Sequence, residues 1–353
     1  MRKARSATLR RAIKATFAVA LLVFGISTII WMNQDSSSSP NPYINISNLP
    51  ESFMNEYLSD YAEVASSDNK RNMLIVTSLE PLEKTFGAKN VINAANNQYF
   101  LEFASAEEKE LAYNQLNSLP NLTVAKNTLR TYYDEPQGKG GYNSWGIEKM
   151  GLDHAKELVE SYPGKSDVLV TILDTGLDVN LFNQNYQGKL PGTFNVQANN
   201  TNVKDEVGHG THIAGTIAEG TPSNVKILSV KMSSTREIYS TDIIAAIDYM
   251  TYYTDTDVVN MSFGGYIYEE AEYLAVEAAK EKGIIILAAA GNESTSERSY
   301  PAAFDTTISI SAVDSDLKFA EFSNYSPTVD FTMPGVDILS INGTMSGTSM
   351  ATP

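Results

Sequence analysis

Residues 167–173 read DVLVTIL, and this nearly continuous run of aliphatic and β-branched side chains decides the fold class. Such a run is typical of a strand that is buried on both faces. Four further runs of the same type follow along the chain, at Val225–Lys231, Val258–Met261, Ile284–Leu287 and Thr306–Ser311. Between them, apolar residues recur at helical spacing in Thr241–Tyr252 and in Glu269–Lys282, and Gly283 is placed as a C-terminal cap. Alternating strands and helices predict a parallel sheet with helices on both faces, with sites at the carboxyl ends of its strands.

The composition is that of a globular protein with more than one domain. At 353 residues, with 42% hydrophobic and 19% charged residues, the chain can bury a substantial core. It contains no cysteine, which excludes a disulfide framework, a thiolate metal site and a cysteine nucleophile. Residues 1–31 hold six of the 26 basic residues and no acidic one, so the remainder has 20 basic and 42 acidic side chains, a formal charge of −22. A body this acidic argues against nucleic acid as a partner.

The N-terminal segment has the pattern of an export signal. Its basic start runs into Ala15–Met32, a stretch without charge, and a basic region followed by an apolar run directs export. No small-x-small cleavage site follows the run, and its length is near the lower limit for a membrane span. Two interpretations of residues 1–32 therefore stay open, a removed signal peptide and an uncleaved signal that anchors the chain in the membrane. Under both, the residues beyond this segment are secreted or extracytoplasmic.

Composition divides the rest of the chain into four parts. Because Ser36–Pro50 is rich in Ser, Pro and Asn, residues 33–70 are predicted to be a linker. Residues 71–133 follow as a small folded unit. A second boundary at 134–144 contains Gly and Pro and has no apolar period, which indicates a flexible segment. The strand-and-helix alternation then occupies residues 145–353.

The pattern within residues 71–133 predicts a small α+β domain. Ser105 and Glu108 form a capping box at the start of a helix, and Leu111 and Leu116 are expected on the apolar side of that helix. The expected elements are the strands Asn72–Ser78, Gln98–Phe103 and Leu122–Tyr132 and the helix Ala106–Leu119.

Three polar residues stand where a parallel sheet forms sites. Asp174 ends the first buried strand, although an aspartate before Thr-Gly can simply cap a turn. His209 stands between two glycines at the start of a helix, which leaves one face of the imidazole open. Ser349 follows Gly-Thr at another helix start, where the dipole and free backbone N–H groups would assist it, although a lone serine there can also be a cap.

The other histidines offer an alternative that we consider weaker. The chain has three histidines in all, His154, His209 and His212. His212 is interpreted as a structural residue, and His154 has no chemical context. A metal-binding pair of His209 and His212 is the rival interpretation, but it lacks the glutamate and the spacing of a zincin helix. We therefore predict no metal site.

Three motifs resemble, in this order, the signatures of the subtilases, the subtilisin-like serine peptidases: Asp174-Thr-Gly, Gly208-His-Gly-Thr-His-Ile-Ala-Gly and Gly347-Thr-Ser-Met-Ala-Thr-Pro. The resemblance covers about 142–353 well, from Trp145-Gly-Ile onward, and residues 71–133 loosely as the ferredoxin-like pro-domain of the family. It implies that residues 145–353 are a three-layer α/β catalytic domain that hydrolyses peptide bonds as a serine endopeptidase.

The resemblance also implies a role for each candidate site residue. Ser349 would attack the peptide, His209 would carry the proton and Asp174 would hold the imidazole. Asn292 would bind the oxyanion together with the Ser349 N–H, since an uncharged donor stabilises developing charge without titrating. The edge strand that pairs with an extended substrate would consist of Ser262, Phe263 and Gly264.

A precursor that processes itself is a further implication of the resemblance. Residues 71–133 would assist folding and occupy the cleft, so the expected partners are polypeptide substrates and the chain's own pro-domain. We expect cleavage between Tyr132 and Tyr142. Only four residues follow Ser349, where the family has an apolar helix, so we expect the chain to be incomplete and, as written, to lack peptidase activity.

Two departures from the family bear on calcium. Leu181-Phe-Asn replaces the usual His-Pro-Asp-Leu after Asp174, and Ala218–Pro222 reaches the next strand without the long loop in which many subtilases bind calcium. Both changes remove oxygen ligands. We therefore predict no cofactor and do not carry calcium over from the family, and calcium binding stays an open alternative.

The substrate is not determined by these motifs. A broad degradative enzyme and a dedicated processor of one peptide would share all of them. Glu293 could favour basic side chains near the cleavage site, but a solvated loop charge explains it equally. The alternative function is a subtilase-like fold that only binds or inhibits peptides, and a fluorophosphonate probe that labels Ser349 would discriminate the two.

Overall fold

The computed structural model describes residues 49–353 except residues 66–69, 134–144 and 163. The predicted export segment at 1–32 and the predicted boundary at 134–144 lie outside the described residues. Residues 42–353 belong to one unit. Of the helices described within it, none combines the length and the apolar character that a membrane span requires.

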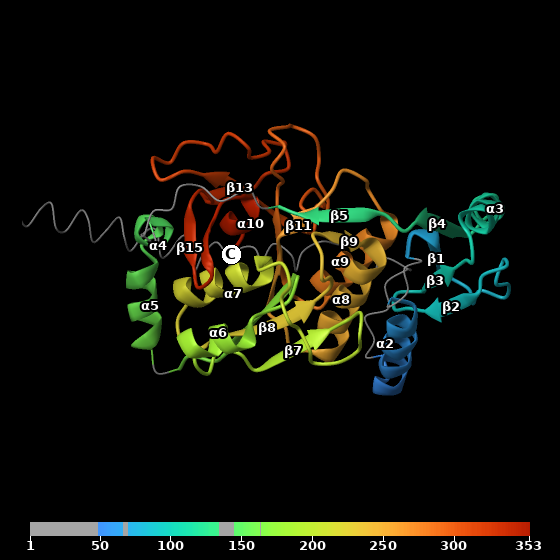
Figure 1. The fold of residues 1–353 in the computed structure, drawn as a ribbon, viewed down its shortest axis with the longest axis horizontal. Helices are drawn as coiled ribbons and strands as arrows, with labels where there is room; N and C mark the ends of the chain where they lie inside the picture. The colour runs from blue at the N-terminus through green and yellow to red at the C-terminus, as the bar shows by residue number, and fades with distance from the viewer. Residues whose placement is uncertain (1–48, 66–69, 134–144, 163) are drawn as a thin grey trace, which may run out of the picture. The chain divides into compact units, whose positions relative to one another are not determined.

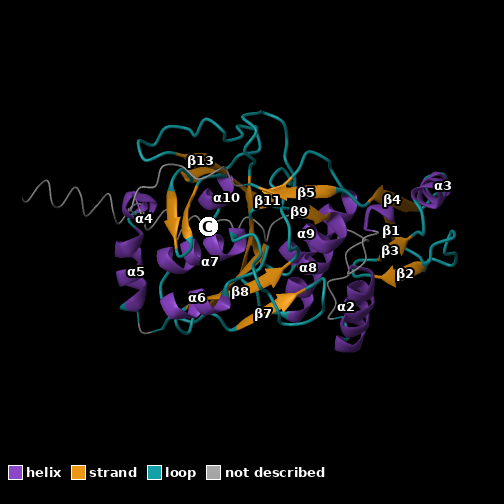
Figure 2. Ribbon diagram, in the orientation of Figure 1, coloured by secondary structure: helices purple, strands orange, loops and turns teal. Residues whose placement is uncertain are grey.

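A seven-stranded sheet forms the centre of the C-terminal two thirds of the chain (Figure 1, Figure 2). Its strands are β6 (Val168–Asp174), β7 (Gly192–Asn195), β8 (Val225–Lys231), β10 (Val258–Met261), β12 (Ile285–Ala289), β13 (Ile308–Val313) and β14 (Phe331–Pro334). The order is β14-β13-β12-β10-β6-β8-β7, and neighbours pair in parallel. The five predicted strands lie in it, each within two residues of its expected bounds. The edge strands β7 and β14 were not predicted, because short and partly exposed strands carry no continuous apolar run.

Helices cover both faces of this sheet. The four that pack closest to the site are α7 (His209–Gly220), α8 (Ser240–Tyr253), α9 (Glu270–Glu281) and α10 (Thr348–Ala351). Leu173 and Met261 pack in one core with α8 and α9, whereas Ile172 and Ile227 pack in another with α7 and α10. Successive side chains of a strand point to opposite faces, so the two cores lie on the two sides of the sheet. The predicted three-layer α/β fold is confirmed.

The small unit at residues 71–133 is an antiparallel sheet with one helix packed on it. Its elements are β1 (Met73–Ser78), β2 (Asn90–Asn93), β3 (Gln98–Glu102), α3 (Ala106–Leu116) and β4 (Leu122–Lys126). The strand order β2-β3-β1-β4 is that of a ferredoxin-like sheet, although residues 79–89, in the first crossover, form no helix. Ser105 caps α3, since its hydroxyl accepts the Glu108 N–H at 3.2 Å.

One detail of the predicted helix was wrong. Leu111 is 62% exposed, not on the apolar side of α3. The buried side chains are Ala112 and Leu116, which pack on Leu74 and Phe103 of the sheet. The helix also ends at Leu116, three residues earlier than expected.

The prediction that residues 33–70 are a linker was also wrong in part. They include α2 (Glu51–Ala65) and the first residue of a short 3₁₀ turn, η1 (Lys70–Asn72). The buried side chains of α2 recur at helical spacing, and they include Met54, Tyr57 and Tyr61. The prediction of a linker rested on the Ser- and Pro-rich residues that precede α2, not on the sequence of α2 itself. The amphipathic pattern of α2 allows it to pack against α8.

The predicted closing strand Leu122–Tyr132 is divided in two. After β4 the chain turns at Asn127, whose amide donates to Lys70 O at 3.0 Å and to Thr241 Oγ1 at 3.1 Å. The second part joins a different, three-stranded sheet with the order β11-β5-β9. Its strands are β5 (Leu129–Tyr132), β9 (Glu237–Tyr239) and β11 (Phe263–Gly264). Figure 1 shows β5 running from the small unit toward α10.

The remaining described elements are short and lie at the periphery of the seven-stranded sheet. They are α4 (Trp145–Met150), α5 (Leu152–Glu160), α6 (Val179–Asn185), β15 (Ile338–Ser340) and β16 (Gly343–Met345).

Candidate active site

An aspartate and a histidine from two neighbouring elements form a buried pair. Asp174 is the last residue of β6, and His209 is the first residue of α7. The Nδ1 atom of His209 lies 2.8 Å and 3.0 Å from the two carboxylate oxygens of Asp174, and neither side chain is more than 1% exposed. Burial raises the pKa of Asp174, while His209 and the Thr175 N–H counteract the rise. The carboxylate therefore fixes the imidazole with Nδ1 toward it and Nε2 away from it.

Asp205 holds the start of α7 in place and was missed by the sequence analysis. Its carboxylate accepts the N–H groups of Gly208 and Thr211 at 2.7 Å and 2.9 Å and the Thr175 hydroxyl at 2.8 Å. Burial alone would raise the pKa of Asp205, but these hydrogen bonds and one from the Thr211 hydroxyl bring it below its ordinary value. The signal in the sequence was an aspartate three residues before a glycine at a helix start.

Ser349 lies in the first turn of α10, which contacts α7 on the same face of the sheet (Figure 1). Its hydroxyl donates to the carbonyl oxygen of Ser262 at 2.8 Å, and the Ser262 hydroxyl donates to the Ser349 carbonyl at 3.1 Å. The Ser349 side chain is buried. These two hydrogen bonds join the serine to the edge strand that the sequence analysis assigned to substrate binding.

Asn292 presents a buried donor beside this serine. Its Oδ1 accepts both the N–H and the hydroxyl of Thr348 at 2.9 Å, so the amide nitrogen must point the other way. That Nδ2 atom is buried and has no hydrogen-bond partner among the described residues. A buried donor without an acceptor is costly, which is the arrangement expected where an oxyanion binds only during a reaction.

Asn324 positions the loop that carries Asn292, and this role was not predicted from the sequence. Its side chain is fully buried, donates to the Ala290 carbonyl at 3.0 Å and accepts the N–H of Glu293 at 2.9 Å. It also fills the space beside Gly291, where a Cβ atom would lie only 2.2 Å from the Asn324 amide nitrogen. Asn324 lies 32 residues further along the chain, so no local pattern could reveal this contact.

Residues 131–133 of the chain itself lie on the predicted substrate strand. Thr131 and Tyr132 pair antiparallel with Gly264 and Phe263, and β9 pairs with the other edge of β5. The ring of Tyr132 lies 5.0 Å from the imidazole ring of His209, measured between centroids.

The peptide groups of Tyr133 contact the predicted nucleophile directly. The Tyr133 carbonyl accepts the Ser349 N–H at 3.2 Å, and the Tyr133 N–H lies 3.1 Å from the Ser349 hydroxyl oxygen. The Tyr133 ring is buried, and its hydroxyl lies 2.7 Å from the Ser299 hydroxyl. The Tyr133 carbonyl thus lies beside the predicted nucleophile Ser349 and accepts a hydrogen bond from the Ser349 N–H, one of the two predicted oxyanion donors.

The other histidines lie apart from this arrangement. His212 is buried, with its Nε2 atom 3.0 Å from the carbonyl oxygen of Ile338. His154 is exposed on α5. In the part of the chain that the structure describes, no group of three or more acidic or histidine side chains could hold a metal ion.

The side chain of Lys189 binds the segment at the C-terminal end of α7. The Nζ atom of Lys189 lies 2.8–3.0 Å from four oxygens, the carbonyls of Ala218, Thr221 and Pro222 and the Thr221 hydroxyl. The ammonium group therefore satisfies the carbonyl oxygens at the C-terminal end of α7, which attract positive charge.

Comparison of the sequence with known proteins finds similar proteins that are serine proteinases. The sequence model of the subtilase family matches residues 165–353, which is more than half of the chain. The chain belongs to the subtilase family. This subtilase is 31% identical over 315 residues to the "Thermophilic serine proteinase" of Bacillus sp. (strain AK1), and the match covers 84% of the chain and 70% of that protein.

Two further relatives carry similar names. Subtilisin NAT of Bacillus subtilis subsp. natto is 36% identical over 212 residues, which cover 55% of the chain and 54% of that protein. Alkaline protease 1 of Aspergillus flavus is 38% identical over 269 residues, which cover 71% of the chain and 61% of that protein. The chain thus spans just over half of the subtilisin and less than two thirds of the fungal protease.

Proposed function

We propose that this subtilase is a serine endopeptidase that cleaves polypeptides through an acyl-enzyme. The observation that carries the proposal is the contact between a peptide carbonyl and the predicted nucleophile, since Tyr133 O accepts the Ser349 N–H at 3.2 Å. Ser349 Oγ would attack such a carbonyl while His209 Nε2 takes the hydroxyl proton. Asp174 would hold the imidazole and stabilise its charged form.

The oxyanion formed by this attack would have two donors. One is the Ser349 N–H, and the other is the Asn292 amide nitrogen, which is buried and has no partner among the described residues. His209 would then give its proton to the departing amine, leaving an acyl group on Ser349. Water would attack that acyl group with the same residues in the same roles.

We further propose that the protein is an exported precursor that cuts its own chain. The support is that residues 131–133 already lie along β11 as a substrate would, with the Tyr133 carbonyl at Ser349. Residues 71–133 would remain in the cleft as an inhibitor until released. We also propose that the segment after α7 binds no calcium ion, because the ammonium group of Lys189 supplies the positive charge there.

The test of the proposed function uses the complete protein and its Ser349→Ala variant. We expect the protein to hydrolyse a chromogenic peptide and to react covalently with a fluorophosphonate at Ser349. Ser349→Ala should lose both, with kcat lower by about 10⁶-fold, the size of effect known for subtilisin itself.

The same measurement separates the two candidate functions. Peptide binding without hydrolysis or labelling would favour a binding protein and contradict the proposal. The matched control is Ser346→Ala, which removes a nearby serine hydroxyl that accepts the Asp337 N–H at 2.8 Å. That variant should keep its fluorophosphonate labelling.

A further inference from the structure

An arginine close to Tyr133 in the chain lies fully buried. The side chain of Arg130 has no exposed surface, although arginine is almost never fully buried unless it is paired. It is three residues before Tyr133, on the strand β5 that pairs with β9 and β11. Its guanidinium stays charged at any pH that a protein tolerates. The surroundings of Arg130 must therefore provide negative charge.

The partner of Arg130 is a carboxylate on α9. One terminal nitrogen of Arg130 donates to Glu272 Oε2 at 2.9 Å and to the carbonyl oxygen of Ile267 at 2.7 Å. The side chain of Glu272 is likewise without exposed surface. Gly265 borders the aliphatic stem of the arginine, since a Cβ atom there would lie 3.1 Å from Arg130 Cδ. The pocket thus consists of a carboxylate, a carbonyl and a gap left by a glycine.

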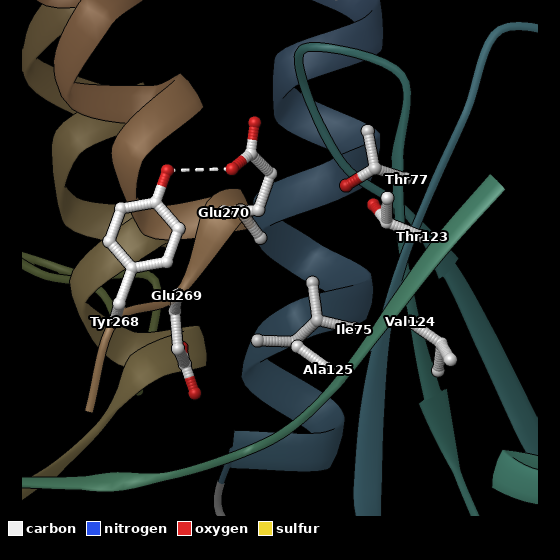
Figure 3. Close-up of a pocket in the computed structure, with 9 residues that line it drawn as sticks. Ile75, Thr77, Thr123, Val124, Ala125, Tyr268, Glu269 and Glu270 are labelled. Atoms are coloured by element: carbon white, nitrogen blue, oxygen red, sulfur yellow. Dashed lines mark hydrogen bonds between the residues drawn. The ribbon is translucent and has the colours of Figure 1, made fainter. Parts of the chain in front are cut away.

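A second carboxylate lies near this pocket, because burial, together with the charge of Glu269, raises the pKa of Glu272. Glu269 is 3% exposed, and one of its oxygens accepts the Thr128 hydroxyl at 2.6 Å. The next residue, Glu270, is different: it is exposed and accepts the Tyr268 hydroxyl at 2.6 Å. Figure 3 shows a different cavity, lined by residues of β1, β4 and the start of α9, in which the Glu269 and Glu270 side chains point in opposite directions.

The position of Arg130 in β5 indicates which residue of a substrate this pocket would bind. If the Tyr133 carbonyl is the one that Ser349 attacks, Arg130 is the fourth residue before the scissile bond. Glu272, Ile267 and Gly265 belong to the catalytic part of the chain, so they stay in place when another peptide replaces residues 129–133. Such a peptide with an apolar fourth residue would leave a buried carboxylate without a partner, which is costly.

We propose that the groove selects polypeptides with arginine at the fourth residue before the scissile bond and that Glu272 is the residue that recognises it. This inference rests on the proposed function and adds a substrate class to it.

The test compares two peptide p-nitroanilides as substrates of the complete protein after release of the N-terminal fragment that ends at Tyr133. Their sequences are Arg-Thr-Tyr-Tyr, as in residues 130–133, and the same peptide with citrulline, a neutral isostere, in place of arginine. Burial raises the pKa of Glu272 to about 7, so the assay is run at a pH of about 8.5 to keep the carboxylate ionised. We expect kcat/KM to be about 10- to 100-fold higher for the arginine peptide, the range for a hydrogen bond between charged partners.

Two variants assign the preference to one side chain. Glu272→Gln should bring the two kcat/KM values within about threefold while it still hydrolyses the citrulline peptide, which shows that the variant is folded. Glu270→Gln removes an equal charge from the same helix outside the pocket and should keep the wild-type ratio.

The outcomes separate this inference from the proposed function. Equal kcat/KM values for the two peptides in the wild type would overturn the inference and leave the peptidase intact. An unchanged preference in Glu272→Gln would also overturn it. Failure of the wild type to hydrolyse either peptide would instead contradict the proposed function.

Discussion

At the scale of single residues, two glycines let backbones and side chains approach where the site needs it. A Cβ atom on Gly210 would lie 2.2 Å from the carbonyl oxygen of Gly176 and 3.1 Å from the Asp174 carboxylate. Only a glycine therefore allows α7 to bring His209 up to β6. Gly264 is similar, because a Cβ atom there would lie 2.8 Å from the Tyr133 ring. If Tyr133 precedes the scissile bond, as proposed, Gly264 provides the space that the side chain of this residue occupies.

This space leads to a prediction for Gly264→Ala. We expect kcat/KM for a peptide that ends in tyrosine to fall by about tenfold or more, because overpacking costs about 1–3 kcal/mol. A peptide that ends in alanine should be hydrolysed within about threefold of the wild-type rate. Gly192→Ala, where the new Cβ would make an ordinary 3.5 Å contact, is the control and should change neither. Equal losses for both peptides would mean that Gly264 does not shape this pocket.

At the scale of elements, α2 and the turn after β2 meet α8 around one buried carboxylate. Asp248 of α8 accepts the Tyr57 hydroxyl at 3.1 Å and the Asn96 amide at 3.3 Å. The Tyr252 hydroxyl belongs to the same hydrogen-bonded group, because it donates to Asn96 Oδ1 at 2.7 Å. Burial raises the pKa of Asp248 to about 7, against the hydrogen bond from Tyr57. When residues 49–133 are docked against α8, Asp248 therefore holds a proton that a solvated aspartate would release.

The raised pKa of Asp248 predicts how pH affects docking of residues 49–133. Between about pH 4, the ordinary range for aspartate, and pH 7, the docked state binds more protons than the released state. Docking should therefore be strongest at low pH and weaken as pH rises to 7, by up to about tenfold per pH unit from this one group.

The measurement is the dissociation constant of the cleaved N-terminal fragment between about pH 5 and pH 8. Wild-type affinity should fall with pH and level off above pH 7. Asp248→Asn cannot titrate and should lose most of that slope, whereas Asp60→Asn, on the exposed side of α2, should keep it. A slope that Asp248→Asn leaves unchanged, or an affinity that rises with pH, would contradict the account.

At the scale of the whole molecule, the sequence predicted what is local or repeated and missed what joins distant segments. The five inner strands were predictable because a strand buried on both faces is a continuous apolar run. Asp174, His209 and Ser349 could be predicted as site residues because each lies in a contiguous motif, and the structure brings the first two within 2.8 Å. Arg130 and Glu272 are 142 residues apart, and only tertiary packing places them together.

The most direct test of the account asks where the chain is cut. The central claim is that the Tyr133 carbonyl, which accepts the Ser349 N–H at 3.2 Å, belongs to the scissile peptide bond. The measurement is the mass of the N-terminal fragment that the complete protein releases, compared with Ser349→Ala. We predict a fragment that ends at Tyr133 in the wild type and an uncut chain in Ser349→Ala. A fragment with another C-terminal residue, or the same cleavage in Ser349→Ala, would contradict the claim.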